Sequence, residues 1–334
     1  LTAYSRQHFP KAFFTAALKH SIDKQKPFEE INELVGDARN NSIDVYTPDL
    51  RNLNKDFSLI NREIYFGLGD IRGIGESILK RLDEIVIETE KKIGNRNSWK
   101  WLDILFYVLP FINSAAAKAI ICSGSIDFCR VPRSTMYYEF EHYVQLKDRE
   151  QNWIIKAYEK DRSKTLIQLI NDLVNVPSGK LAGGCSSKKR LEAVNGILNL
   201  LKNPPFSIED SIEWIAGVEQ ELMGISLSCT KVDACDISAA NCDCRSFING
   251  YSRPGPVLIA VKIDRIKEIV TKKGDKMCFL NVGDISGNID SVVVFPNVYS
   301  SYKSLIIDDN TVMLSGKRDE KNKSNLIVDK VFQL

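Results

Sequence analysis

Several features that would mark an enzyme are missing from this chain of 334 residues. It has no phosphate-binding Gly-x-x-x-x-Gly-Lys loop, no Gly-x-Ser-x-Gly nucleophile motif, and no Asp-x-Asp strand motif of the kind that holds two divalent metals in a polymerase palm. The only three histidines, His8, His20 and His142, lie in expected helices without partners, and we interpret them as surface residues. We therefore expect no catalytic residue within this chain.

Long apolar runs and a strong net charge are also lacking. No run approaches the roughly 18 to 20 residues that span a bilayer, and the first residues lack the layout of a signal peptide, so we expect a soluble, cytoplasmic protein without a membrane partner. Because residue 1 is Leu and not Met, we expect a fragment, a processed product or the ordered part of a longer chain. The net charge of +2 demands no nucleic-acid partner, so any such surface must depend on local clusters of Lys and Arg.

The composition, 44% hydrophobic and 26% charged, is typical of a globular protein long enough for two or three cores. Apolar residues recur at helical spacing on both sides of a polar connection over residues 23–27, which predicts two antiparallel helices within residues 1–40. The pattern then predicts an extended segment at 43–50, short helices over 99–129, helical and more polar chain over 134–175, a breaker-rich loop at 176–190, and helices near 190–202 and 207–223.

After residue 252 the periodicity changes from that of helices to that of strands. Five β-rich segments follow, with a helical stretch between the third and the fourth, and this is the element order of an OB-fold. We therefore expect an α+β multidomain protein, with a mainly α-helical N-terminal region that contains a helix-hairpin-helix, followed by a C-terminal β-barrel OB-fold. The strands are expected at 257–266, 277–282, 289–295, 311–315 and 325–331, and the helix at 298–305.

A glycine-rich motif, Ile-Arg-Gly-Ile-Gly-Glu-Ser-Ile over residues 71–78, precedes an amphipathic helix. Glycines let a backbone approach a phosphate closely, and the N–H groups at a helix start attract an anion, so the motif fits a helix-hairpin-helix that contacts the duplex backbone without reading its sequence. The alternative is a glycine-rich turn that binds nothing. The candidate residues are Arg72, Gly73, Ile74, Gly75, Lys80 and Arg81.

Two loops of the expected barrel are rich in cations, and they are the loops that OB-folds use on nucleic acid. Lys272, Lys273 and Lys276 lie between the first and second strands, and Lys317, Arg318, Lys321 and Lys323 lie between the fourth and fifth. We expect them to bind single-stranded DNA, although lysines also favour solvated hairpin tips. Four aromatic residues, Phe279, Phe295, Tyr299 and Tyr302, could stack bases, but in so small a barrel we expect core positions.

Four of the eight cysteines, Cys229, Cys235, Cys242 and Cys244, lie within sixteen residues. Four thiolates can hold a tetrahedral Zn²⁺, yet the paired Cys-x-x-Cys spacing of zinc knuckles is missing. We expect reduced, partly buried thiols, with a zinc site as the alternative.

Six stretches, in order and spacing, resemble the alpha subunit of bacterial DNA polymerase III, the C-family of replicative polymerases. The most specific, Phe-Gly-Leu-Gly-Asp-Ile-Arg-Gly-Ile-Gly-Glu at residues 66–76, is similar to the family's Tyr-Gly-Leu-Gly-Ala-Ile-Lys-Gly-Val-Gly-Glu. Ser42, Thr47 and the Cys229-Thr230 pair depart from the family pattern, which indicates a divergent or phage member. The other stretches are 1–18, which resembles the fingers segment, 40–49, 112–127, 219–228 and 270–296.

The resemblance implies a DNA-binding C-terminal portion of a replicative polymerase, a nucleotidyltransferase that acts in the bacterial nucleoid or in a phage-infected cell. It implies duplex product held by the helix-hairpin-helix, single-stranded template near the OB loops, and a sliding-clamp partner. The PHP domain and the palm, with its aspartates and Mg²⁺, would lie upstream of Leu1, so we expect this segment to need no cofactor and to be inactive alone. Residues 168–174 are the nominated clamp-binding peptide, against the alternative of an amphipathic helix.

Two further interpretations stay open. The chain could be a stand-alone accessory module that holds DNA without chemistry, or a zinc-stabilised scaffold whose main partner is a protein. The domains that we expect are a fingers-like helical segment at 1–60, a helix-hairpin-helix region at 61–130, a helical region with a Cys-rich linker at 131–252, and the OB-fold at 253–334.

Overall fold

The computed structural model describes residues 2–176, 185–250 and 255–334, so parts of the expected 176–190 loop and of the boundary near residue 252 lie outside the described residues. The chain forms two compact units. Unit 1 comprises Leu1–Pro48, Asp56–Asp70 and Ser211–Leu334, and unit 2 comprises Asp49–Lys55 and Ile71–Asp210. Each unit therefore combines segments that are distant in the sequence. The four domains expected as consecutive ranges stay a prediction.

Unit 1 begins with helices separated by prolines. Pro10 and Pro27 each stand in the first turn of a helix, where the missing N–H costs no hydrogen bond. The two helices expected before residue 41 are present, and a further short helix precedes them. The elements are α1 (Thr2–His8), α2 (Pro10–Ser21) and α3 (Pro27–Asn40), followed by a small sheet of β1 (Val45–Tyr46), β2 (Ser58–Ile60) and β3 (Glu63–Tyr65) in the order β1-β3-β2.

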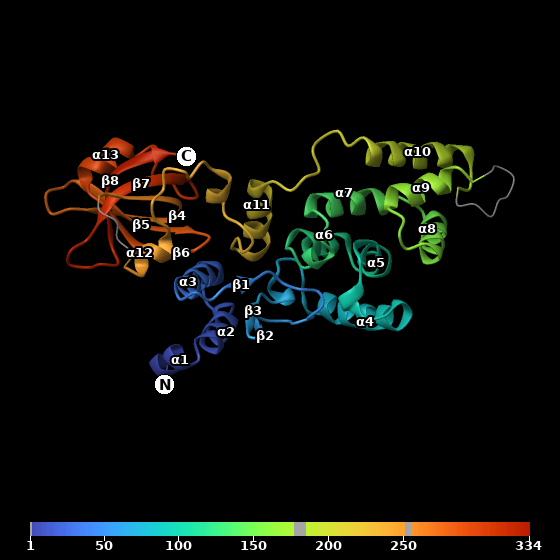
Figure 1. Cartoon of the computed structure of the whole chain (residues 1–334), viewed down its shortest axis with the longest axis horizontal. Coiled ribbons are helices and arrows are strands. Elements are labelled where there is room, and N and C mark those ends of the chain that lie inside the picture. Colours follow the sequence, from blue (N-terminus) through green and yellow to red (C-terminus); the bar gives the residue numbers. More distant parts are fainter. Residues whose placement is uncertain (1, 177–184, 251–254) are drawn as a thin grey trace. The chain divides into compact units, whose positions relative to one another are not determined.

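The last part of unit 1 is a closed five-stranded barrel (Figure 1). Its strands pair in the order β4-β5-β6-β8-β7, with β7 closing on β4, and β6 runs parallel to β8. This order, with a helix between the third and fourth strands, is that of the OB-fold. The elements are β4 (Val257–Val270), β5 (Lys276–Asp284), β6 (Gly287–Val294), α13 (Pro296–Tyr302), β7 (Thr311–Arg318) and β8 (Leu326–Gln333).

Alternating apolar residues fill the barrel, as strand geometry requires. Ile259, Val261 and Ile263 of β4 point into one core with Leu280 and Val282 of β5, and all five are fully buried. The predicted α+β fold with a C-terminal five-stranded barrel is confirmed. The remaining elements of unit 1 are the 3-10 helices η1 (Leu68–Asp70) and η5 (Lys231–Ala234), α11 (Ile212–Met223) and α12 (Cys244–Ile248).

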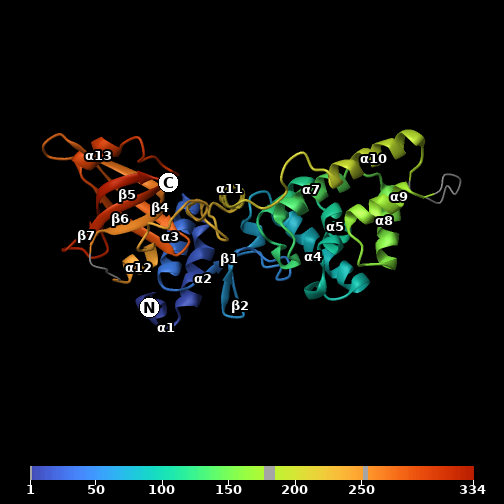
Figure 2. The same cartoon turned by 45° about the horizontal axis from the view of Figure 1, so that its top comes forward.

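Helix α3 packs against β6 of the barrel (Figures 1 and 2). Two asparagines and two glycines form this contact. The side-chain amide of Asn40 donates to the backbone oxygen and to Oδ1 of Asn288, each at 2.9 Å. A Cβ at Gly36 would overlap the Asn288 side chain, and a Cβ at Gly287 would overlap that of Asn40. Each asparagine therefore occupies space that the opposite glycine leaves open, and this fixes the barrel on the N-terminal helices.

Unit 2 consists of helices around a core of aromatic and aliphatic side chains. Phe106 is buried in this core, with its ring centroid 5.1 Å from that of Tyr143 and 5.2 Å from that of Tyr158. Helices α8, α9 and α10 pack in succession at one end of this unit (Figure 2). The α-helices are α4 (Glu76–Ile93), α5 (Trp101–Tyr107), α6 (Ser114–Cys122), α7 (Arg133–Tyr143), α8 (Asp148–Lys160), α9 (Leu166–Val174) and α10 (Lys188–Lys202); the 3-10 helices are η2 (Arg96–Ser98), η3 (Leu109–Phe111) and η4 (Asp127–Cys129).

None of the helices among the described residues is long and apolar enough to cross a membrane.

The interpretation of all three histidines as surface residues is wrong for His142, which is 8% exposed and whose Nδ1 is 2.8 Å from the carbonyl oxygen of Tyr138. His142 is thus held in the α7 packing.

Candidate nucleic-acid interface

The glycine motif of unit 2 forms a tight turn directly before α4. The N–H of Ile74 donates to the carbonyl of Ile71 at 3.0 Å, and Gly73 has a φ of +90°, which a type II turn requires at this position. Ile71 and Ile74 are buried and anchor the turn, whereas Gly73 and Gly75 are exposed. The turn therefore presents its glycine backbone to solvent.

Gly75 is the N-cap of α4 and has no side chain to satisfy the first N–H groups of the helix. A Cβ added at Gly73 or at Gly75 would meet no described atom within 4 Å. Gly75 has an ordinary φ of −86°, so neither packing nor backbone conformation requires glycine at this position. The open space beside Gly75 and the free helix start are what a closely approaching phosphate needs.

The charges around this turn have both signs. Arg72, Lys80 and Arg81 are exposed, as a phosphate contact requires, and Arg81 lies 3.4 Å from Glu84 one turn further along α4. Glu76 occupies the first turn, where its carboxylate competes with a phosphate for the positive end of the helix. The ammonium of Lys55, which the sequence analysis did not single out, lies 3.5 Å from Glu76 and partly neutralises it.

The β4–β5 hairpin of unit 1 presents the first lysine group. Its tip is closed by hydrogen bonds from the Gly274 N–H to the Thr271 carbonyl at 2.9 Å and from the Thr271 N–H to the Asp275 carbonyl at 2.8 Å. Lys272 and Lys273 lie at this tip, Lys276 begins β5, and all three are exposed. Lys276 is 3.6 Å from Glu268, so the two tip lysines are the freer cations.

The β7–β8 connection is less uniform than its sequence indicates. Lys317, Lys321 and Lys323 are exposed, but Arg318 turns toward the barrel. Its guanidinium lies 4.0 Å from the ring centroid of Phe247 and donates to the carbonyls of Phe247 and Lys323. Arg318 therefore holds the loop onto α12, and the three lysines carry the charge that faces solvent.

The barrel aromatics follow the expected preference for packing in part. Tyr299 is 4% exposed and its hydroxyl is hydrogen-bonded to Glu268, and Tyr302 packs against the same core. Phe279 is half-buried, whereas Phe295 is 47% exposed. Of the four, Phe295 is the side chain that is open to a base.

The chain that carries these cations is similar to subunits of a DNA polymerase. No protein-family model matches the chain. DNA polymerase III subunit alpha of Borreliella burgdorferi is 21% identical over 100% of the chain, that of Aquifex aeolicus 25% over 99%, and that of Staphylococcus aureus 22% over 100%. The chain is similar over its whole length to DNA polymerase III subunit alpha.

The resemblance read from the sequence motifs is thereby confirmed. The matches cover 26%, 24% and 27% of the three relatives, so the chain spans about a quarter of the length of the polymerase subunits it matches. The similarity runs through the α4 turn, the helices of unit 2 and the barrel alike.

The nominated clamp-binding peptide, residues 168–174, lies within α9. Thr165 caps this helix, accepting a hydrogen bond from the Gln168 N–H, while the Gln168 side chain accepts one from the Thr165 N–H. Leu169, Ile170 and Leu173 are buried between neighbouring helices. These apolar side chains already have partners inside unit 2, so the peptide stays a prediction that would require α9 to open.

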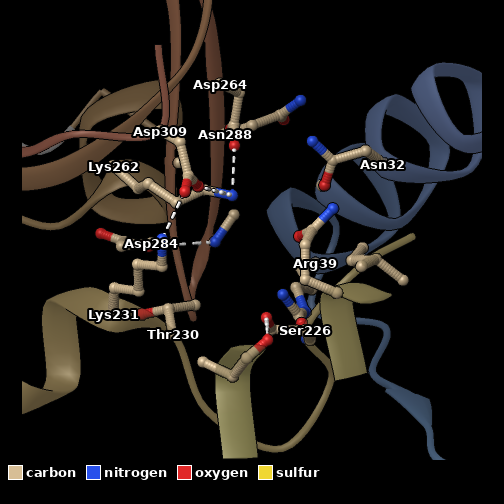
Figure 3. Close-up of a pocket in the computed structure, with 16 residues that line it drawn as sticks. Asn32, Arg39, Ser226, Thr230, Lys231, Lys262, Asp264, Asp284, Asn288 and Asp309 are labelled. Carbon is tan, nitrogen blue, oxygen red and sulfur yellow. Dashed lines mark hydrogen bonds and ion pairs between the residues drawn. The ribbon is translucent and has the colours of Figure 1, made fainter. Parts of the chain in front are cut away.

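A polar recess lies between α3, the barrel and α11 (Figure 3). Lys262 Nζ is 3.0 Å from Asp264 and 3.7 Å from Asp309, and the buried Arg39 donates to the Leu227 carbonyl at 3.1 Å. Burial raises the pKa of the Asp264 carboxyl, and the Lys262 ammonium opposes that rise. The charged groups compensate one another, so we interpret the recess as part of the seam that holds α3 on the barrel.

The four clustered cysteines have separate surroundings. The thiols of Cys229 and Cys235 each donate to a backbone carbonyl, at 3.6 and 3.5 Å, while Cys244 is fully buried in the barrel core and Cys242 packs at its edge. Burial raises the pKa of Cys235, Cys242 and Cys244, which favours the thiol over the thiolate that binds metals. Among the described residues, no three His, Cys, Asp or Glu side chains form a group that could hold a metal ion.

We expect elemental analysis of the purified chain to find well under one zinc per molecule, because a structural site needs four converging ligands, mostly thiolates or imidazoles. The matched measurement uses the chain with Cys242 and Cys244 changed to Ser. Stoichiometric zinc that disappears in this variant would establish the zinc-site alternative instead.

Proposed function

We propose that this chain is a DNA-binding segment of a replicative DNA polymerase of the DNA polymerase III alpha type. The observation that carries the proposal is the pairing of whole-length similarity to that subunit with a closed OB-type barrel whose hairpins present lysines. The barrel loops would bind the single-stranded template, and the α4 turn would bind the backbone of the duplex product.

The two surfaces suit these two forms of DNA for physical reasons. The flexible cations at the β4–β5 tip can follow an irregular strand, and the exposed Phe295 offers a ring for stacking. The α4 turn is anchored by the buried Ile71 and Ile74, and its exposed backbone suits a phosphate in the regular backbone of a duplex.

Polymerisation is proposed for the complete polymerase. The Mg²⁺-dependent transfer of nucleotides needs carboxylates that hold two metals, and we assign these to the palm of the complete enzyme. A sliding clamp is a proposed partner of that assembly. The stand-alone module is the less favoured alternative, because the similarity to the polymerase subunit also covers the helices between the turn and the barrel.

Changing Lys272, Lys273 and Lys276 to Ala is expected to weaken single-strand binding, because each lysine that contacts a phosphate releases counterions on binding. The slope of log affinity against log salt should fall by about 0.7 per lost contact, or about 2 in all, while duplex affinity changes less. Fluorescence anisotropy with labelled oligonucleotides at several salt concentrations measures both quantities.

The matched control changes Lys267, Lys303 and Lys330 to Ala, three exposed lysines of the same barrel outside the two loops. This variant loses the same charge and should keep the slope of the unaltered chain. Equal losses of single-strand affinity in both variants would show that binding depends on the net charge of the barrel and not on the lysines of the hairpin. No loss in either would refute the assignment of the barrel loops.

A further inference from the structure

The segment of unit 2 that contains helices α8, α9 and α10 is much more basic than the rest of the chain. Residues 147–202 contain eleven Lys and Arg against six Asp and Glu, a net charge of +5, while the whole chain carries +2. The remainder is therefore slightly acidic. Neither the α4 turn nor the barrel loops lie in this segment, so its charge belongs to neither surface described above.

A buried ion pair brings two helix starts of this segment together. The guanidinium of Arg190, in the first turn of α10, donates to both carboxylate oxygens of Glu150 in α8, at 2.7 Å each, and to the Gln145 carbonyl at 2.9 Å. Glu150 is 1% exposed. Such a pair contributes little net stability but fixes its geometry, because either charge left alone would remain buried without a partner.

The pair gathers cations at one end of the α8–α10 helices. Lys188 and Lys189 directly precede Arg190 in the first turn of α10, and Lys147 and Arg149 flank the start of α8. All four are exposed. We call these four residues the basic end.

Nearby carboxylates do not cancel the charge of the three lysines in the basic end. Glu150 is already neutralised by Arg190, and Asp148 and Glu192 are the exposed carboxylates on the same two helix starts. Among the described residues, no carboxylate lies within 4 Å of the ammonium of Lys147, Lys188 or Lys189. These lysines are free to meet an external anion.

The cations continue along one face of α8. Arg149, Lys156 and Lys160 are spaced by seven and four residues, which places them within about 40° of one another around the helix. They extend over about 16 Å at a rise of ~1.5 Å per residue. Phosphates follow one another every ~3.4 Å along the axis of each duplex strand, so this row could follow about five of them.

We propose that the basic end and the α8 row form a third DNA surface, which binds the phosphate backbone of duplex DNA. The proposal rests on the proposed function, since it adds a contact to the same DNA. A row of exposed point charges on a rigid helix suits a regular polyanion and carries no sequence information. Lys147, Lys188 and Lys189 make the outermost contacts.

The test measures binding of the full chain to a blunt duplex of random sequence, and to a single strand of equal length, between about 50 and 200 mM salt. The variant has Lys147, Lys188 and Lys189 changed to Ala and leaves the Arg190–Glu150 pair intact. Its slope of log duplex affinity against log salt should fall by about 0.9 per lost contact, and by up to about 3. Single-strand binding should change little, as should duplex binding by the Lys267, Lys303 and Lys330 control.

The outcomes separate the two proposals. If the unaltered chain binds no duplex, both are overturned. If it binds duplex and the variant keeps the same affinity and slope, the third surface is refuted while the proposed function stands. If variant and control lose equally, the effect is one of net charge and the third surface is again refuted.

Discussion

Replacing Gly75 by valine is expected to lower the duplex affinity of the chain at least tenfold while leaving its fold intact. Gly75 has an ordinary φ, and a Cβ there would meet no described atom within 4 Å. The valine side chain would therefore occupy the space beside the start of α4 into which a phosphate must come. Valine is a poor N-cap, but the change from glycine should cost only about 1 kcal/mol of unfolding free energy.

Gly73 makes a less informative variant because its φ of +90° is strained for other residues, at a cost on the order of 1–2 kcal/mol. A loss of binding there could come from the turn itself. Anisotropy with a labelled duplex measures the Gly75→Val effect, and urea unfolding followed by circular dichroism measures its stability.

The control is Gly217→Val in α11, where a Cβ also meets no described atom within 4 Å. It carries the same side chain at a site without a proposed ligand, so duplex affinity should stay within a factor of two of the unaltered chain, on the order of 0.4 kcal/mol. If Gly75→Val bound duplex as well as this control, the α4 turn would not be a phosphate site.

Replacing Gly316 by valine is expected to disrupt the barrel. A Cβ at this position would overlap the carbonyl oxygen of Ile327, and would lie 3.0 Å from its carbonyl carbon and 3.1 Å from Cα of Val328. All three atoms are backbone of β8, which cannot turn aside as a side chain can. Gly316 lies at an irregularity in the β7–β8 pairing, where the strands approach closely.

The unfolding free energy of the barrel should fall by about 3 kcal/mol or more, as for other severe overpacking. Urea unfolding followed by circular dichroism measures this loss. Single-strand binding should fall with it, because the lysine hairpins depend on the barrel for their position.

Gly316→Ala serves as the milder variant if the valine form cannot be isolated, and Gly217→Ala is the control. The latter should stabilise α11 by up to about 1 kcal/mol, since alanine is the better helix residue. A Gly316→Ala chain as stable as the unaltered one would contradict the close approach of β7 and β8.

Local patterns in the sequence predicted much of this architecture. The strands were recognisable because β-rich segments of five to ten residues lie between Gly, Asn and Asp turns. Strands β2 and β3 were missed because three residues are too few to show a period of two. Helix α1, the first of the three N-terminal helices, was not predicted as a separate helix, because the break at Pro10 falls inside a continuous helical pattern.

The candidate site was predicted less evenly. The turn at Gly73 follows from glycine chemistry, which is local, and the exposure of the β4–β5 lysines follows from their place at a hairpin tip. Arg318 looked equivalent to its lysine neighbours, yet it lies on Phe247, a residue of another element. The surplus of positive charge over residues 147–202 can be counted from the sequence. Its location in the fold follows only from the structure, in which Arg190 pairs with Glu150 and brings the starts of α10 and α8 together.

The sequence by itself predicted the strands of the barrel, the glycine turn and the likeness to DNA polymerase III subunit alpha, because each is visible in patterns of neighbouring residues. The tertiary structure alone decided which distant segments meet: α3 on β6 through Asn40 and Asn288, and the start of α8 with that of α10. The residues in contact are 248 positions apart in the first case and 40 positions apart in the second. Their partners are selected by shape and charge on surfaces that exist only after folding, so no local pattern encodes them.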